Sequence, residues 1–215
     1  MNLFRFHQKD TYKSFSALLK KEADGVDYHI VLKHRNTPLV VIAPHGGSIE
    51  GGTSELAKAI AGNEFSLYCF EGLKKRENKN LHITSTNFDE PRCIELIRSS
   101  SIALALHGCD DEEAIAFVGG LDRKGTAFII DALLKAGLNA IEDTTHHSGK
   151  EKTNICNQGK CRKGIQIEIS KGLRKQMFRG LSRQERPYTT PMFDTFVRAV
   201  QNIAMILNEE NQLPV

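Results

Sequence analysis

The sequence predicts an α/β fold, with a mixed, mainly parallel sheet between two layers of helices. Short apolar runs rich in β-branched residues alternate along the chain with segments whose apolar residues recur at helical spacing. Two of these runs, PLVVIAP at 38–44 and IALAL at 102–106, have no polar face, as expected of strands covered on both sides. No linker separates two folded units, so we expect a single three-layer α/β/α domain over residues 1–215.

The first half of the chain is expected to be rich in strands. The helix at 11–23 has a sparse apolar face, YHIVLK alternates like an edge strand, and Thr53 or Ser54 can cap the next helix. The elements expected here, in chain order, are a helix at 11–23, strands at 28–33 and 38–44, a helix at 53–61, and strands at 65–70 and 82–86.

The second half repeats the alternation of helices and strands. Gly137 stops an amphipathic helix, GIQIEI alternates along its length, and the last helix has a continuous apolar face. The elements expected here, in chain order, are a helix at 90–99, strands at 102–106 and 114–118, a helix at 124–136, strands at 138–141 and 164–169, and a helix at 195–208.

Composition excludes several classes of protein. Hydrophobic residues make up 40% and charged residues 26%, which argues against disorder, and no apolar run reaches the roughly 18–20 residues of a membrane helix. A net charge of +3 and the absence of Trp give no support to nucleic-acid binding. The five cysteines fit reduced thiols, and MNLFRFHQKD has no secretory h-region. We therefore expect a protein that is cytoplasmic at synthesis, with no nucleic-acid or membrane partner.

Polar residues follow the two most apolar strands. His45 and His107 each come directly after such a run and each precedes glycine, while Glu168 lies near the end of the strand at 164–169. Ligand sites of open α/β sheets lie beyond the carboxyl ends of the strands, and catalytic zinc takes three protein ligands and leaves room for water. Glu50 and Glu55 are both candidates for the carboxylate ligand. We favour Glu50, because Glu55 falls in the first turn of a helix, where a carboxylate is stabilising anyway.

The chain resembles the phage-associated poly-γ-glutamate hydrolase family, which is similar in turn to zinc carboxypeptidases and to amidohydrolases of acylated aspartate or glutamate. The resemblance rests on colinear motifs between about residues 40 and 179, namely APHGGSIEGGTSELAKAIAG, YCFEGLK, LHITSTNFDEP, LALHGC, FVGGLD and NICNQGKCRKGIQIEISKGLR. It implies a zinc carboxypeptidase-like domain with one Zn²⁺ ion, a phage or bacterial setting, and release by lysis to act on extracellular polymer. By motif, His45, Glu50 and His107 would be the ligands and Glu168 the general acid/base.

Basic and amide side chains near Glu168 suggest how an anionic substrate would be held. Arg92 and Arg174 are the candidates for contacts with substrate carboxylates, and Asn154 and Asn157 could donate hydrogen bonds to the substrate or serve in turns. A run of basic residues is expected to form a cationic cleft around Glu168 or, alternatively, an ordinary solvated face. Its members are Lys160, Arg162, Lys163, Lys171, Arg174, Lys175 and Arg179.

The function expected from these features is zinc-dependent hydrolysis of the γ-glutamyl amide bonds of poly-γ-glutamate, with metal-activated water and Glu168 as general acid/base. One alternative keeps the site and changes the substrate to small N-acyl amino acids or γ-glutamyl peptides. Another, of a different class, is a non-catalytic module that binds an anionic partner.

Overall fold

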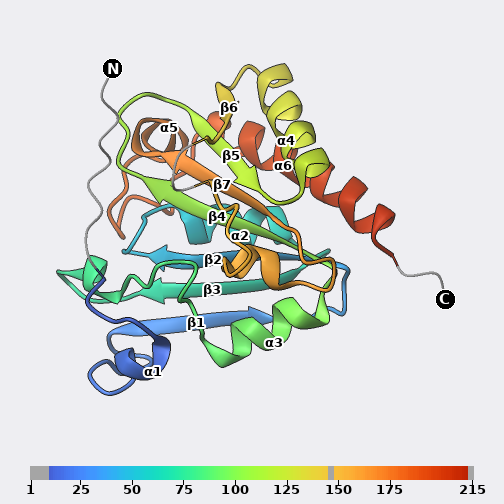
Figure 1. Cartoon of the computed structure of the whole chain (residues 1–215). Coiled ribbons are helices and arrows are strands. Elements are labelled where there is room, and N and C mark those ends of the chain that lie inside the picture. Colours follow the sequence, from blue (N-terminus) through green and yellow to red (C-terminus); the bar gives the residue numbers. More distant parts are fainter. Residues whose placement is uncertain (1–9, 145–147, 213–215) are drawn as a thin grey trace.

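The computed structural model describes residues 10–144 and 148–212. Within this part of the chain, seven strands form one sheet in the order β1-β3-β2-β4-β7-β5-β6 (Figure 1). The strands are β1 (Tyr28–Lys33), β2 (Leu39–Gly47), β3 (Ser66–Gly72), β4 (Ile102–Cys109), β5 (Ala116–Gly120), β6 (Ala140–Glu142) and β7 (Ile165–Ser170).

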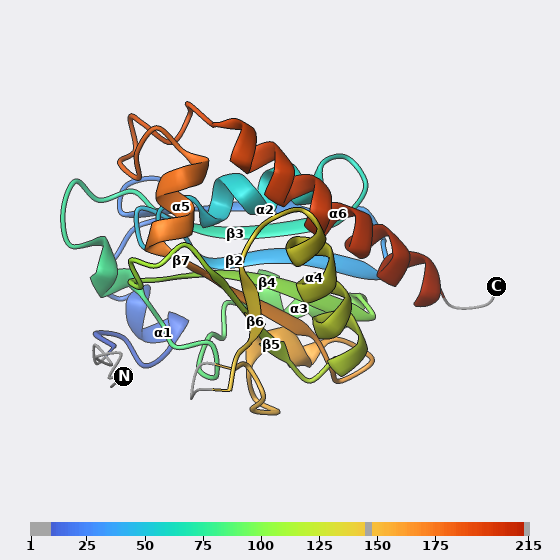
Figure 2. The same ribbon diagram turned by 90° about the horizontal axis from the view of Figure 1, so that it is seen from above.

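Helices cover both faces of this sheet (Figure 2). They are α1 (Phe15–Leu18), α2 (Thr53–Ala61), α3 (Pro91–Ser99), α4 (Arg123–Lys135), α5 (Lys171–Met177) and α6 (Pro191–Glu210), with 3₁₀ helices η1 (Asn78–Leu81) and η2 (Ile155–Gln158). The helices α2, α4, α5 and α6 pack on one face, and α1, α3 and η2 on the other. The expected α/β class with a mixed, mainly parallel sheet is confirmed.

The central strand β2 shows why its sequence lacks a polar face. Val41 belongs to the core under α2 and α6, whereas Val40 and Ile42 belong to the core on the opposite face, and all three side chains are fully buried. A strand covered by helices on both sides has no solvent-facing residues, so its sequence is continuously apolar. The cysteines Cys69, Cys93 and Cys156 fill space in these same cores.

Two expected elements differ in the structure. The predicted strand at 82–86 is a loop that follows η1, and its backbone binds side chains in place of a neighbouring strand: the Thr84 amide donates to Asp10, and the Ile83 carbonyl accepts from His45. The helix expected at 11–23 contracts to the four residues of α1, and the short helix α5, which begins at the Ser170 cap, was not expected.

The direction of the strands fixes where a site can form. The four neighbouring strands β3, β2, β4 and β7 run parallel, whereas β1 and β5 run antiparallel to their neighbours β3 and β7. The carboxyl ends of the four parallel strands therefore share one edge, on the left in Figure 1. This edge is called the carboxyl edge below, and the opposite one the amino edge.

The helices also bear on the question of a membrane. Among residues 10–144 and 148–212, none of the helices combines the length and the apolar character needed to cross a bilayer.

The buried sheet predicts a large difference between core and surface truncations. Leu104 of β4 is 1% exposed in the core under α2, whereas Ile206 of α6 is 42% exposed. We expect Leu104→Ala to lower the free energy of unfolding by about 2–5 kcal/mol, through lost burial and the cavity that it leaves. Ile206→Ala is the control and should change it by less than about 1 kcal/mol. Chemical denaturation measures both, and equal losses would contradict this assignment of the core.

Candidate metal centre and active site

His45 lies at the carboxyl edge on the last part of β2. The β2–β3 register shifts between Ala43 and Gly46, so the strand is irregular where His45 sits. The imidazole is 2% exposed, and its Nε2 lies 2.8 Å from the carbonyl oxygen of Ile83. A carbonyl only accepts, so Nε2 carries a proton and Nδ1 is the nitrogen that faces Glu50. His45 therefore presents Nδ1 as its available ligand atom.

A tight glycine-containing loop brings Glu50 back beside His45. The Glu50 amide donates to the carbonyl of His45 at 2.9 Å, which closes the turn. One carboxylate oxygen, Oε1, lies 3.1 Å from His45 Nδ1, and the other accepts a hydrogen bond from the Gly108 amide at 2.8 Å. Burial alone would raise the pKa of Glu50, but the charge of His45 and hydrogen bonds from His107 and His45 hold it well below its usual value. The group is therefore held as a carboxylate.

His107 completes a cluster of three donor groups. Its Nδ1 lies 3.1 Å from His45 Nδ1 and 3.7 Å from Glu50 Oε2, and its ring is 2% exposed. Burial lowers the pKa of His107, but hydrogen bonding to Glu50 and the charge of Glu168 raise it above its ordinary value. Ligand atoms about 2.0–2.1 Å from a tetrahedral Zn²⁺ are separated by about 3.3 Å. The donor types and their spacing fit one such ion.

The structure separates Glu50 from Glu55, the two carboxylates left open by the sequence. Glu55 lies on α2 and accepts a hydrogen bond from Arg186 Nε at 2.7 Å, far along the loop that follows α5. Arg186 is 5% exposed and also donates to the carbonyl of Leu181. Glu55 thus holds this loop against α2, and Glu50 is the carboxylate beside the histidines.

His82 is a member of this neighbourhood that the sequence did not single out. Its ring lies over that of His45, with centroids 3.9 Å apart, and its Nε2 is 3.9 Å from Glu50 Oε1. His45, Glu50 and His82 form a group whose ligand atoms all lie within 4.8 Å of one another. Nothing local in the sequence signals this placement, because Asp10, which accepts from His82 Nδ1 at 2.7 Å, is 72 residues away.

Glu168 lies beside His107 on the neighbouring strand. The two residues are register partners in the parallel pair β4–β7, so their side chains leave the sheet on the same face. Gln166 Nε2 donates to Glu168 Oε1 at 3.1 Å, and Gln166 Oε1 in turn accepts from Asn154 Nδ2 at 3.1 Å. Asn154 therefore fixes which end of the Gln166 amide points at Glu168, and the carboxylate is oriented by this chain of amides.

The other predicted substrate contacts have strong partners within the protein. Both N–H groups of the Asn157 amide donate to carbonyls, those of Gly149 and Glu151, and its oxygen accepts from the Gly164 amide. Arg92 pairs with Glu90 at 2.9 Å and with Asp24 at 3.7 Å. These bonds organise loops, so contact of either residue with a substrate stays a prediction.

Arg174 is a buried tie between the strand ends. The guanidinium is 4% exposed and donates to the carbonyls of Ile169, Gly51 and Cys109 at 2.8–3.0 Å. These carbonyls lie at the end of β7, beside Glu50, and at the end of β4. Burial lowers the pKa of Arg174, although the charges of Glu50 and Glu168 favour its cationic form. Its contact with a substrate stays a prediction, and its observed bonds hold the three segments together.

The expected cationic cleft around Glu168 is not present as such. Lys160, Arg162 and Lys163 lie at the amino edge, where the Lys160 amide donates to the carbonyl of Ser100, just before β4 begins. A strand advances about 3.3 Å per residue, so the five residues from Lys163 to Glu168 separate them by roughly 16 Å. At the carboxyl edge, Lys171 and Lys175 both bind Glu112. The first three basic residues of the run are close to Glu168 in the sequence but not in space, because β7 runs from the amino edge to the carboxyl edge.

Comparisons with known protein families and structures agree with the α/β fold described above. The family model for poly-gamma-glutamate hydrolase matches residues 12–199. A bacteriophage poly-gamma-glutamate hydrolase structure superposes with a TM-score of 0.91 at 32% identity, covering 94% of this chain and all of the other. A zinc-free structure of YndL superposes at 0.88 with 38% identity, covering 94% of this chain and 99% of the other.

Curated relatives agree with this assignment. The UPF0714 protein YndL of Bacillus subtilis is 42% identical over 185 residues, which cover 85% of this chain and 73% of the relative. YmaC of the same organism is 39% identical over 92% of this chain and 85% of the relative. The protein is thus an α/β protein with a His-Glu-His cluster at the carboxyl edge of its sheet. It belongs to the poly-gamma-glutamate hydrolase family.

The cluster predicts which histidines determine metal content. His45→Ala and His107→Ala each remove one of three converging donors, so we expect each to lower the affinity for Zn²⁺ by more than about 100-fold. His82→Ala is the comparison within the same site and should cost about tenfold or less. Metal analysis after dialysis against a zinc buffer measures this. If His107→Ala kept its full zinc content and His82→Ala lost zinc, His82 would be the metal ligand and His107 would not.

Proposed function

We propose that this chain is a zinc-dependent hydrolase that cleaves the γ-glutamyl amide bonds of poly-γ-glutamate. The observation that carries the proposal is the convergence of His45 Nδ1, Glu50 and His107 Nδ1 beside Glu168 at one sheet edge. Membership of the family supports the substrate class, and the zinc-free form of the relative YndL supports the choice of metal.

His45, Glu50 and His107 would hold the ion. A bound Zn²⁺ supplies a Lewis acid that polarises the scissile carbonyl and makes water acidic enough to be used near neutral pH. The protein orients these ligands before the ion binds. Ile83 fixes His45 with its Nδ1 lone pair toward the site, and the Gly108 amide anchors the Glu50 carboxylate. These contacts to the ligands limit the reorganisation that metal binding requires.

Glu168 would carry the proton. In amide hydrolysis the attacking water loses a proton, and the departing amine must gain one before the C–N bond breaks. Glu168 lies next to His107 and outside the three-ligand cluster, so in this proposal its carboxylate takes the first proton and returns it to the nitrogen. The Asn154–Gln166 pair keeps the carboxylate pointing one way through both transfers.

A direct test separates binding of the metal from catalysis. Glu168→Gln removes the proton carrier but leaves its shape, so we expect zinc content to be unchanged and hydrolysis of poly-γ-glutamate to fall at least about 10²-fold. Product sizing by chromatography measures the cleavage. Glu142→Gln, a change at an exposed residue of β6, is the control and should behave as the unmodified protein.

The same assay is run with and without a chelator. Loss of polymer cleavage on chelation and its return with added Zn²⁺ would support the proposal. Undiminished cleavage by Glu168→Gln would contradict the role of this residue. Turnover of short γ-glutamyl peptides or N-acyl amino acids without shortening of the polymer would favour the small-substrate alternative, and polymer binding without any turnover the binding module.

A further inference from the structure

The cations at the carboxyl edge divide into two groups. Most already have a partner: Lys74 binds Glu22, Lys79 binds Asp110, and Lys171 and Lys175 share Glu112. Those two lysines lower the pKa of Glu112 to about 2. Arg179 lies over the ring of Tyr188, 5.5 Å from its centroid. Lys75, Arg76 and Arg183 are exposed and have neither an ion pair nor such a ring contact within residues 10–144 and 148–212. We call these three residues the basic lip.

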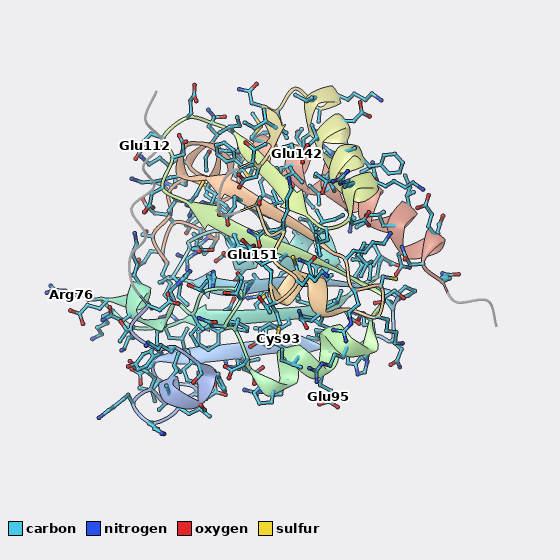
Figure 3. All side chains as sticks on the ribbon, viewed as in Figure 1. Arg76, Cys93, Glu95, Glu112, Glu142 and Glu151 are labelled. Atoms are coloured by element: carbon cyan, nitrogen blue, oxygen red, sulfur yellow. The ribbon has the colours of Figure 1, made fainter. Side chains whose placement is uncertain are left out.

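The basic lip is continuous with the candidate active site. Lys75 and Arg76 follow β3, whose last residue Gly72 accepts a hydrogen bond from the Ser48 amide, two residues before Glu50. Arg183 belongs to the loop after α5, and its guanidinium donates to the carbonyl of Leu73 at 3.5 Å. The two loops therefore meet beside the turn that carries Glu50. Figure 3 shows Arg76 projecting outward from this edge.

On the other flank of the same edge, the lysines are already paired. Four consecutive acidic residues, Asp110, Asp111, Glu112 and Glu113, follow β4, where Asp110 binds Lys79 and Glu112 binds Lys171 and Lys175. Glu112 lies well away from Arg76 (Figure 3). Two exposed carboxylates, Glu77 and Glu185, lie in the loops of the lip itself. A polyanion that reaches Glu168 is therefore attracted more strongly on the side of the lip than on the β4 side.

We propose that the basic lip is a subsite that binds the free carboxylates of the polymer outside the bond being cleaved. This inference rests on the proposed function. A γ-linked chain of glutamate keeps one α-carboxylate on every residue, so a long substrate offers successive anions to Lys75, Arg76 and Arg183. In this proposal a γ-glutamyl dipeptide bound at Glu168 is too short to reach the lip. The lip thus favours long chains over short ones.

The test compares two triple variants with the same change in net charge. One replaces Lys75, Arg76 and Arg183 by Gln, and its matched control replaces Lys160, Arg162 and Lys163, which are exposed at the amino edge. Binding of poly-γ-glutamate is measured on metal-free protein, so cleavage does not interfere. Each exposed contact between a cation and a carboxylate contributes less than a tenfold change in affinity. Loss of all three contacts should therefore weaken the binding of polymer by the lip variant about tenfold. The control should stay within about twofold of the unmodified protein.

A second measurement keeps the subsite distinct from catalysis. Hydrolysis of a γ-glutamyl dipeptide by the zinc-loaded protein should be the same in both variants. Equal polymer affinity in the two variants, whether lowered or not, would overturn the subsite. Failure of the unmodified protein to hydrolyse any γ-glutamyl substrate would refute the proposed function, while the polymer-binding comparison still decides the lip.

An independent observation concerns Asp10. Its Oδ1 accepts from His82 Nδ1 at 2.7 Å, and its Oδ2 accepts from the Thr84 amide at 2.7 Å. Between these two residues lies Ile83, whose carbonyl binds His45 Nε2. Burial raises the pKa of Asp10, but hydrogen bonds from His82 and Thr84 lower it to about 2. One carboxylate therefore holds both ends of the short segment whose carbonyl binds His45 Nε2.

We also infer that Asp10 is a positioning residue of the metal centre, acting through the 82–84 segment. This rests on the proposed metal ligands. Holding Ile83 in place keeps a proton on His45 Nε2 and turns Nδ1 toward Glu50 and His107. Holding His82 keeps its ring over that of His45. Contacts one step removed from a metal commonly change its affinity about 10- to 100-fold.

Asp10→Asn tests this inference, because an amide offers one oxygen where the carboxylate offers two. The control is Asp89→Asn, at a carboxylate that also ties the N-terminal segment, through the Phe15 amide, but does not contact the 82–84 segment. Asp10→Asn should lower Zn²⁺ affinity about tenfold in chelator competition, and Asp89→Asn should not. In crystal structures of the metal-free variants, the Ile83 carbonyl should stay within hydrogen-bond distance of His45 Nε2 in Asp89→Asn but not in Asp10→Asn.

The outcomes separate the two ideas. Equal zinc affinity and an unchanged Ile83–His45 contact in the two variants would overturn the positioning role. If the unmodified protein bound no zinc but Asp10→Asn still broke the Ile83–His45 contact, the metal proposal would fall and the role of Asp10 in holding His45 would stand.

Discussion

The parallel alignment of β2, β4 and β7 is the constraint on which the rest of the structure depends. It brings the ends of three strands to one edge, and these ends carry His45, His107 and Glu168. The parallel sheet is stabilised because its apolar side chains are buried under helices on both faces. The polar side chains of the candidate site lie at the strand ends, where hydrogen bonds and ion pairs replace apolar packing.

Buried hydrogen bonds hold those ends in place. Arg174 joins the carbonyls beside Glu50 and at the ends of β4 and β7, so that three segments from distant parts of the chain share one cation. Buried carbonyls need donors, and a guanidinium offers five N–H groups in a fixed plane. The Glu55–Arg186 pair holds the next loop against the same turn. The rigidity of the candidate site thus comes from charged side chains that do not themselves belong to the His-Glu-His cluster.

Much of this arrangement could be predicted from the sequence. The bounds expected for β1 and α2 coincide with the structure, because alternation and a clear apolar face are local properties. His45, Glu50 and His107 do meet, as expected from two glycine-flanked histidines after buried strands. The strand expected at 82–86 was wrong, since local β-propensity cannot show that the backbone of this segment binds the side chains of Asp10 and His45.

The sequence by itself determined the fold class, the sheet edge at which polar residues gather, and the family. The tertiary structure decided the partners of each charge. It paired Glu50 with the histidines and Glu55 with Arg186. It also placed His82 beside His45, Asp10 beside His82, and part of the basic run at the amino edge. The physical reason is that burial and strand alternation are set by neighbouring residues, whereas hydrogen bonds and ion pairs join residues tens of positions apart. Their pairing becomes defined only when the sheet is assembled.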